Sequence, residues 1–373
     1  MKSLTFIKTV AISIMITLGV TACDRDQPPP EIETPVAADE QTAADTATTG
    51  DMQTEVACAA SASWVSNPNP PDEIPGGGQN FCQFYQFSWQ WFLYLMSPSA
   101  DDPGLRNFQV QADYPMLQVN GDSCSGAVTK PVFFVRTIKD DDEGTDFVIP
   151  ERINQAGDQA TIYDQNGNVV FYSIVFGRDL CTAPDSGDLP ADTTEIKMAW
   201  RVIDEADKAN YIWMEADVIP DNNSENIIPE TLGLVGYHLV RGTAQHPELV
   251  WATFEHKDNV PDCLGPQPAP AAGWSFLSAS CADCLNSPDG DCFNTCNYNA
   301  ASPATSLTGT PSEICRVFPD GTAPGDNKGE ENVADVDALN AQLVGPGGIL
   351  SALPASDPMA VLANYFNVGA LWV

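Results

Sequence analysis

The chain has 373 residues, 43% of them hydrophobic, and its 51 Asp and Glu outnumber 16 Lys and Arg to give a formal net charge of −35. This length can bury a substantial core in one large domain or two smaller ones. Nucleic acid is excluded as an expected partner, because neutralising phosphates requires clustered Lys and Arg. A basic patch that docks on an anionic bilayer is excluded for the same reason. The excess of acid indicates high solubility, or a surface that attracts cations or basic partners.

Residues 1–22 are typical of an export signal. Lys2 and Lys8 precede an apolar run over residues 10–20 that is too short for a membrane span. The segment ending in Ala22-Cys23 resembles the lipobox of bacterial lipoproteins. That resemblance implies removal of residues 1–22 and lipidation of Cys23, and the alternative is an ordinary signal peptide cleaved near Ala22.

Residues 23–57 are rich in Pro, Ala, Thr and acidic residues and carry almost nothing apolar. Such a composition predicts a disordered acidic tether between the membrane and the folded part. Asp24 resembles an inner-membrane retention signal, which favours the inner over the outer membrane. We therefore expect a protein of the bacterial cell envelope, held to the membrane by its N-terminal lipid and facing the periplasm.

Residues 58–262 are predicted to form a β-rich domain that begins with one helix. From residue 128 to 256, β-branched and aromatic runs alternate with turn residues, and no helix-length pattern separates them. The expected fold is mainly β (α+β), an antiparallel sandwich or open barrel. Before these strands, apolar residues three or four apart predict a buried aromatic helix ending near Pro98, with a stripe of Phe81, Phe84, Tyr85, Ser88, Trp89, Phe92 and Leu93.

Eleven cysteines minus Cys23 leave ten, which in an exported protein predict up to five disulfides without fixing their pairing. Six of them fall in residues 263–330, a Pro/Ser/Gly/Asn-rich segment expected to form an irregular Cys-rich lobe. Residues 331–373 are expected to supply a short helix and a final strand that pack on the β-rich domain. The ten disulfide candidates are Cys58, Cys82, Cys124, Cys181, Cys263, Cys281, Cys284, Cys292, Cys296 and Cys315.

The lobe contains a C-x2-C-x7-C-x3-C pattern that begins at Cys281. Inside a cell this spacing would indicate zinc, whereas outside it oxidation to disulfides is favoured. A c-type haem needs C-x-x-C-H, but Leu285 follows Cys284. No cofactor is predicted. Acidic loops at residues 139–146 and 220–226 could bind calcium, although neither has EF-hand spacing.

Two of the three histidines, His238 and His256, lie in a predicted hairpin. His256 stands beside Glu255 and Asp258, residue types that serve as acid–base groups or metal ligands. If Leu239 lay opposite Trp251, both histidines would face the same way about 13 Å apart, too far to share a metal ion. The alternative is that His256 ends the strand and hydrogen-bonds a backbone carbonyl, with Asp258 and Asn259 forming the turn.

Four segments together resemble an uncharacterised family of exported bacterial proteins: QFSWQWFLYL, IKMAWRVI, the hairpin that contains WATFEH, and the terminal NYFNVGALWV. Some members extend into a C-x-x-C-H-like segment and are labelled cytochrome c-like. This chain lacks that segment, so the resemblance implies a shared fold unit and no haem.

The resulting hypothesis is a lipid-anchored envelope protein that acts as a non-enzymatic binding or scaffold module for an envelope protein or a small ligand. The alternative is a metal-dependent enzyme or a redox accessory of cytochromes. It would use His256, Glu255, Asp258 and His238, and whether the protein is an enzyme at all stays open.

Overall fold

The computed structural model describes residues 58–116, 124, 132–134, 162–182, 189–219, 228–263, 267–286, 295–300, 307–317 and 327–371. The expected signal peptide, the lipidation site Cys23, the tether and both acidic loops lie outside these residues. Within the described part, no helix is long and apolar enough to cross a bilayer.

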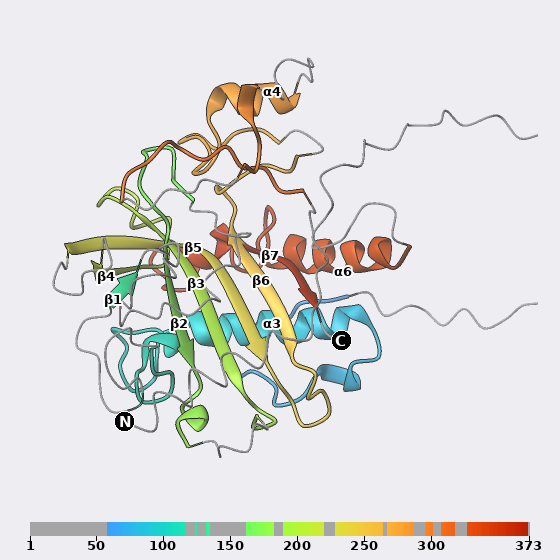
Figure 1. Ribbon diagram of the computed structural model, residues 1–373. Helices are drawn as coiled ribbons and strands as arrows, with labels where there is room; N and C mark the ends of the chain where they lie inside the picture. Colours follow the sequence, from blue (N-terminus) through green and yellow to red (C-terminus); the bar gives the residue numbers. More distant parts are fainter. Residues whose placement is uncertain are drawn as a thin grey trace, which may run out of the picture.

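One mainly antiparallel sheet organises the described residues, as the sequence predicts (Figure 1). All its neighbouring strands are antiparallel except the parallel pair β1–β4. Its seven strands are β1 Val132–Phe134, β2 Phe171–Phe176, β3 Thr194–Val202, β4 Trp213–Ile219, β5 Ile228–Arg241, β6 Val250–His256 and β7 Tyr365–Leu371.

Strand β5 holds this sheet together because it pairs along both edges. On one edge it pairs with β3, and on the other with β4 in its first half and β6 in its second. Strand β3 also pairs with β2, and β1 joins β2 to β4, so these five strands close into a ring. Strands β6 and β7 extend the sheet beyond the ring. The result is a mainly β fold, as predicted, built on one sheet in which five strands close into a ring and two extend it.

Helix α3, Phe81–Met96, covers one face of this sheet (Figure 1). It begins where the Asn80 side chain accepts a hydrogen bond from the Gln83 N–H, and it ends just before Pro98. Most of its aromatic side chains are buried, as expected, although Phe81 and Tyr94 are only partly buried. Phe92 stacks on Phe254 of β6 with ring centroids 4.1 Å apart. Aromatic pairs of this kind contribute about 0.5–1.5 kcal/mol beyond area burial.

The remaining helices are short or peripheral. Helix α6, Asn327–Leu343, packs against α3 and β7, while α4, Ala279–Asn286, belongs to the Cys-rich lobe at the top of Figure 1. The others are α2 Ser63–Ser66, η1 Pro75–Gly77, η2 Asn107–Gln109, η4 Arg178–Cys181 and η6 Ala360–Asn364.

The predicted disulfides are present, and the structure supplies the pairing that the sequence left open. Two bonds lie outside the lobe, Cys58–Cys82 and Cys124–Cys181. Two lie within it, Cys263–Cys315 and Cys281–Cys296. Cys284 is disulfide-bonded as well, and Cys292 lies outside the described residues.

The aromatic contact between α3 and the sheet leads to a stability prediction. Replacing Phe92 by Ala removes a fully buried ring that packs on Phe254 and Tyr237. The free energy of unfolding, measured by urea denaturation, should fall by about 3–5 kcal/mol. Gln90→Ala on the same helix is the control and should change it by no more than about 0.5 kcal/mol. Equal losses for both variants would contradict the assigned core.

Candidate functional site: a cavity between the sheet and the Cys-rich lobe

His256 is fully buried at the end of β6, where hydrogen bonds and a stacked ring fix its side chain. Its Nε2 donates to the Asn210 carbonyl oxygen at 3.0 Å, and its Nδ1 accepts from the Asp258 N–H at 3.2 Å. The ring stacks on Tyr211 with centroids 4.1 Å apart. Burial lowers the pKa of His256 to about 4, so the imidazole is neutral. With both nitrogens engaged, this side chain is a structural element of the strand end.

His238 faces the opposite side of the sheet from His256, which corrects the register assumed from the sequence. Leu239 pairs with Ala252, not with Trp251, so the assumed register is wrong by one residue. A one-residue shift exchanges the two faces of a strand. Apolar residues occupy both faces of this hairpin, and alternation alone therefore could not select the register. No site built on His238 and His256 together is possible.

The acidic neighbours of His256 are also engaged elsewhere. The Glu255 carboxylate accepts from Arg316 at 2.7 Å, and Asp258 lies 3.4 Å from the Lys257 ammonium. The third histidine, His246, binds Glu248 in the loop between β5 and β6. The structure therefore does not bring the predicted candidates together around one metal ion or substrate.

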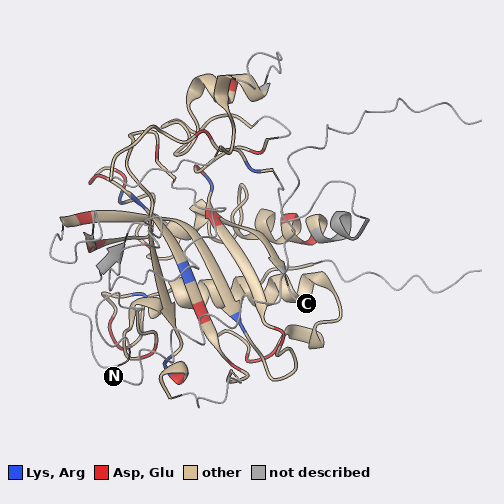
Figure 2. Ribbon diagram, viewed as in Figure 1, with Lys and Arg blue, Asp and Glu red and all other residues tan. Residues whose placement is uncertain are grey.

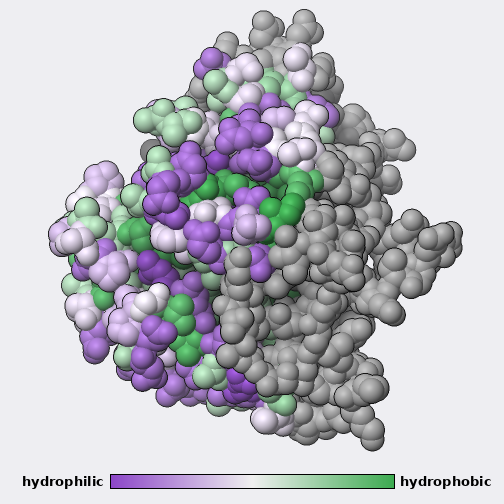
Figure 3. All heavy atoms as spheres, turned by 90° about the vertical axis from the view of Figure 1, so that its left-hand side faces the viewer, coloured by the Kyte–Doolittle hydropathy of each residue, from purple (hydrophilic) through white to green (hydrophobic). Residues whose placement is uncertain are grey.

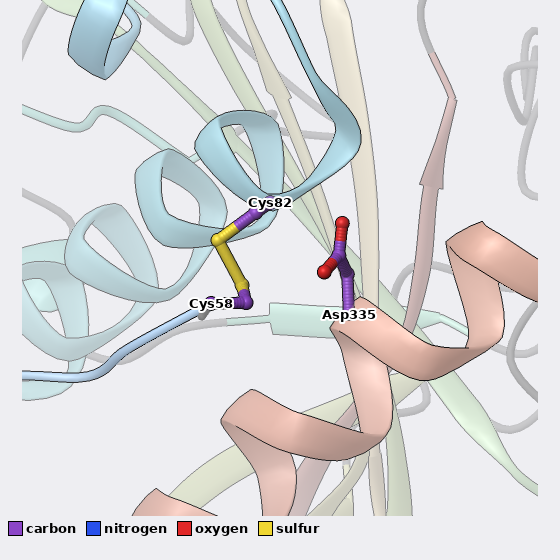
Figure 4. A group of neighbouring side chains, drawn as sticks. All are labelled: Cys58, Cys82 and Asp335. Atoms are coloured by element: carbon purple, nitrogen blue, oxygen red, sulfur yellow. A yellow bond between two sulfur atoms is a disulfide. The ribbon is translucent and has the colours of Figure 1, made fainter. Parts of the chain in front are cut away.

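The only cluster of potential metal ligands within the described residues combines Cys58, Cys82 and Asp335, and Figure 4 shows it. Both sulfurs are joined in a disulfide bond. Metal-binding cysteines act as thiolates, so this pair cannot serve while it is oxidised. The group is a cross-link between the N-terminal segment and α3.

A cavity of about 220 Å³ with mainly apolar walls lies on the sheet face opposite α3. We name it the lobe cavity. Its floor comes from the sheet, where Ala199 pairs with Gly236 and Gly236 pairs with Glu255. A methyl group at Gly236 would contact only the Ala199 methyl, at 3.4 Å, so two small residues leave this floor open.

The roof of the lobe cavity comes from the chain beyond β6. Apolar side chains from the Cys-rich lobe, the turn after β6, β2 and the hairpin before β2 form its walls. Figure 3 shows apolar side chains at the surface between hydrophilic ones. The apolar wall residues are Ile162, Val170, Ile174, Val260, Phe276 and Ile314.

Hydrogen bonds and one disulfide hold the lobe in place over the cavity. The Phe276 N–H donates to the Asn259 carbonyl oxygen at 3.0 Å, and Ile314 N–H donates to Phe276 at 2.8 Å. The Cys263–Cys315 bond joins the two segments that carry Val260 and Ile314. The disulfide thus cross-links two segments of the roof, and the hydrogen bond to Asn259 ties the roof to the turn after β6.

A buried ion pair adds a further brace between sheet and lobe. Arg201 of β3 lies 3.3 Å from Asp164, which is fully buried, and donates to the Ser275 hydroxyl at 3.0 Å. Its guanidinium also reaches the hydroxyl of Tyr211, whose ring stacks on His256. The strand end that contains His256 and the lobe that covers the cavity therefore share one polar network.

His238 and Lys197 contribute polar atoms to the cavity from adjacent strands, where they pair directly. The Nδ1 of His238 lies 2.8 Å from the Thr253 hydroxyl. Removal from water, together with the Lys197 charge, lowers the pKa of His238 to about 4. A nitrogen of such low basicity is a weak general base at neutral pH, because catalytic bases work best with a pKa near the operating pH.

Sequence reasoning missed the lobe cavity because its residues come from separate segments. One local signal was present: Gly233 and Gly236 interrupt an otherwise β-branched and aromatic strand. Glycine inside a strand often marks a bulge or a close approach. The register shift between Ala199 and Trp200 lies at this point. The signal could have located the opening, although not the residues that cover it.

Searches of protein-family models, of curated proteins and of solved structures found no significant match to this chain. The resemblance inferred from the WATFEH hairpin therefore stays a prediction.

The buried histidine leads to a pH prediction. Because His256 has a pKa of about 4 when folded and about 6.5 when unfolded, the unfolded chain binds more protons between these values. Stability should therefore fall as pH is lowered from 6.5 to 5, by up to about 1.4 kcal/mol per pH unit from His256, measured by urea unfolding. His238, whose pKa is also about 4, adds a slope of similar size. His256→Gln should therefore remove about half of the total slope, whereas His246→Gln in the loop should keep all of it. An unchanged slope in His256→Gln would disprove the assignment.

Proposed function

We propose that the protein is a lipid-anchored envelope binding protein that holds a small amphipathic molecule in the lobe cavity. The observation that supports this most directly is a preformed cavity with apolar walls and a few polar groups, the usual composition of ligand sites. Its volume of about 220 Å³ suits a small molecule. For comparison, an engineered apolar cavity of roughly 150 Å³ binds benzene.

Preorganisation of the cavity further supports binding. The roof is held by the Cys263–Cys315 disulfide and by the Arg201–Asp164 pair, so little order has to be created when a ligand enters. Binding loses less free energy when a site is already ordered. A site built in this way fits a protein that captures a molecule in the oxidising envelope.

An enzymatic role using His256 has less support. Both ring nitrogens of His256 are engaged by backbone groups, and its carboxylate neighbours bind other partners. The His238–Thr253 contact resembles a base with a hydroxyl, but the low pKa of His238 makes it a poor base. The groups around the cavity are better suited to hold a molecule than to transform it.

The anchor is a separate part of the proposal, supported by the signal-like residues 1–22 and the segment ending in Cys23. The predicted tether allows the folded part to stand away from the membrane. Cys23→Ser should abolish incorporation of labelled palmitate and move the protein out of the membrane fraction, whereas Thr21→Ser should do neither. Labelling that persists in Cys23→Ser would rule out lipidation at this residue.

Filling the cavity tests the binding function. Gly236→Val adds a β-branched side chain to the cavity floor, its Cβ meeting only the Ala199 methyl at 3.4 Å, in a strand that favours such residues. Small amphipathic compounds that raise the melting temperature of the full-length protein should no longer do so in this variant. Thr231→Val, on the same strand but outside the cavity, should respond like the wild type.

The control for folding is the unliganded melting temperature of Gly236→Val, which should stay close to that of the wild type. A library in which no compound stabilises the wild-type protein, or in which the active compounds stabilise Gly236→Val equally, would contradict a binding role for the cavity.

A further inference from the structure

Asn259 presents an unpartnered acceptor at the lobe cavity. This residue is 6% exposed and lines the cavity. Its Nδ2 donates to the Val235 carbonyl oxygen at 2.7 Å, and because a carbonyl only accepts, this contact fixes the orientation of the amide. The Oδ1 atom is buried and has no donor among the described residues. A buried acceptor in this state favours a ligand that brings a hydrogen-bond donor.

Glu255 lines the same cavity from β6, and it belongs to a cluster with a net negative charge. Its Oε2 accepts from Arg316 at 2.7 Å, and the same guanidinium binds Asp262 at 2.5 Å. One cation is thus shared between two carboxylates. An excess of negative charge stays beside the cavity, next to the unpartnered Asn259 carbonyl.

The other ionisable groups at the cavity do not cancel this preference. Lys197 is paired with Glu195 at 3.2 Å and lies 5.6 Å from the ring centroid of Trp251. Glu195 and Trp251 both pair with Val240, about 13 Å along β5 from Gly236. His238 is uncharged at neutral pH because its pKa is about 4. The side of the cavity near Gly236 therefore faces acceptors and negative charge.

The remaining walls define the other part of the ligand. They are mainly aliphatic side chains with the rings of Tyr172 and Phe276, and the volume exceeds that known to hold benzene. An aromatic ring or a branched aliphatic group with a short chain fits this space. The net charge of −35 would also raise the concentration of small cations near the surface, and Figure 2 shows acidic residues spread over several elements with few basic ones.

From these observations we infer that the lobe cavity takes a primary amine with a small aromatic or branched aliphatic body, whose ammonium group donates to Glu255 Oε1 and Asn259 Oδ1. This inference rests on the proposed binding function and adds the chemical class of the ligand. No bond is made or broken in the complex.

Three probes with the same ring test the head group: 2-phenylethylamine, 2-phenylethanol and 3-phenylpropionate, titrated calorimetrically into the full-length protein at pH 7. The amine should bind at least about tenfold more tightly than the alcohol, because hydrogen bonds to charged groups are worth roughly twice neutral ones. The carboxylate should bind most weakly, since it would face Glu255.

Two matched variants test the residue assigned to the ammonium group. Glu255→Gln and Asp262→Asn each remove one carboxylate from Arg316, but only Glu255 lines the cavity. Glu255→Gln should weaken amine binding at least about tenfold and reduce the preference over the alcohol. Asp262→Asn should change the amine affinity less than about twofold. If both variants weaken amine binding equally, the affinity depends only on how the two carboxylates hold Arg316, and the assignment of Glu255 to the ammonium group is wrong.

The outcomes separate this inference from the function on which it rests. If the alcohol or the carboxylate binds as tightly as the amine, and Gly236→Val abolishes that binding, the cavity binds ligands and the amine inference is wrong. If none of the three probes binds, the amine inference is also wrong, and the library screen decides whether the cavity binds anything. Amine binding that Gly236→Val leaves intact would place the site elsewhere and overturn both.

Discussion

Strand β5 is the element on which the rest of the structure depends, because its backbone bonds along both edges determine which side chains reach which face. The register with β3 and β6 places Tyr237 against Phe92 of helix α3 and His238 toward the lobe cavity. A shift by one residue would reverse this arrangement. The aromatic layer of α3 favours the observed register, since only one face of β5 can complete that core.

The register of β5 places the two histidines of its hairpin with β6 in different chemical environments. His256 lies on the core side, where burial lowers its pKa and keeps the imidazole neutral. His238 lies on the other side, where it borders a cavity beneath the lobe. The same residue type is a structural element in one case and part of a candidate binding surface in the other.

The Cys-rich lobe has a role that its composition did not suggest. The hydrophobic core of the lobe is small, as expected for a Pro- and Gly-rich segment, and its disulfides supply stability that this core does not. The lobe also covers the sheet face that α3 leaves free, and Phe276 and Ile314 turn that face into a cavity wall. Stabilisation of the lobe and formation of the site are therefore two results of the same contacts.

Local patterns in the sequence were sufficient for the aromatic helix, the antiparallel strands and the existence of disulfides. The spacing of Phe84, Trp89 and Phe92 predicted the buried helix because a period near 3.6 residues is a local property. The register predicted for the hairpin was wrong because Val240 and Trp251 make the outer face of the hairpin apolar as well. The position of His256 at a hydrogen-bonded strand end was anticipated as one of two alternatives.

The sequence by itself determined the kinds of elements, the expected export signal and the even set of cysteines, because these depend on neighbouring residues and on composition. Only the tertiary structure decided the disulfide pairing, the faces of β5 and the lobe cavity. Gly236, Glu255, Asn259 and Phe276 come together there through strand register and chain folding over long sequence distances. Local periodicity carries no information about such contacts, so the candidate site became visible only in three dimensions.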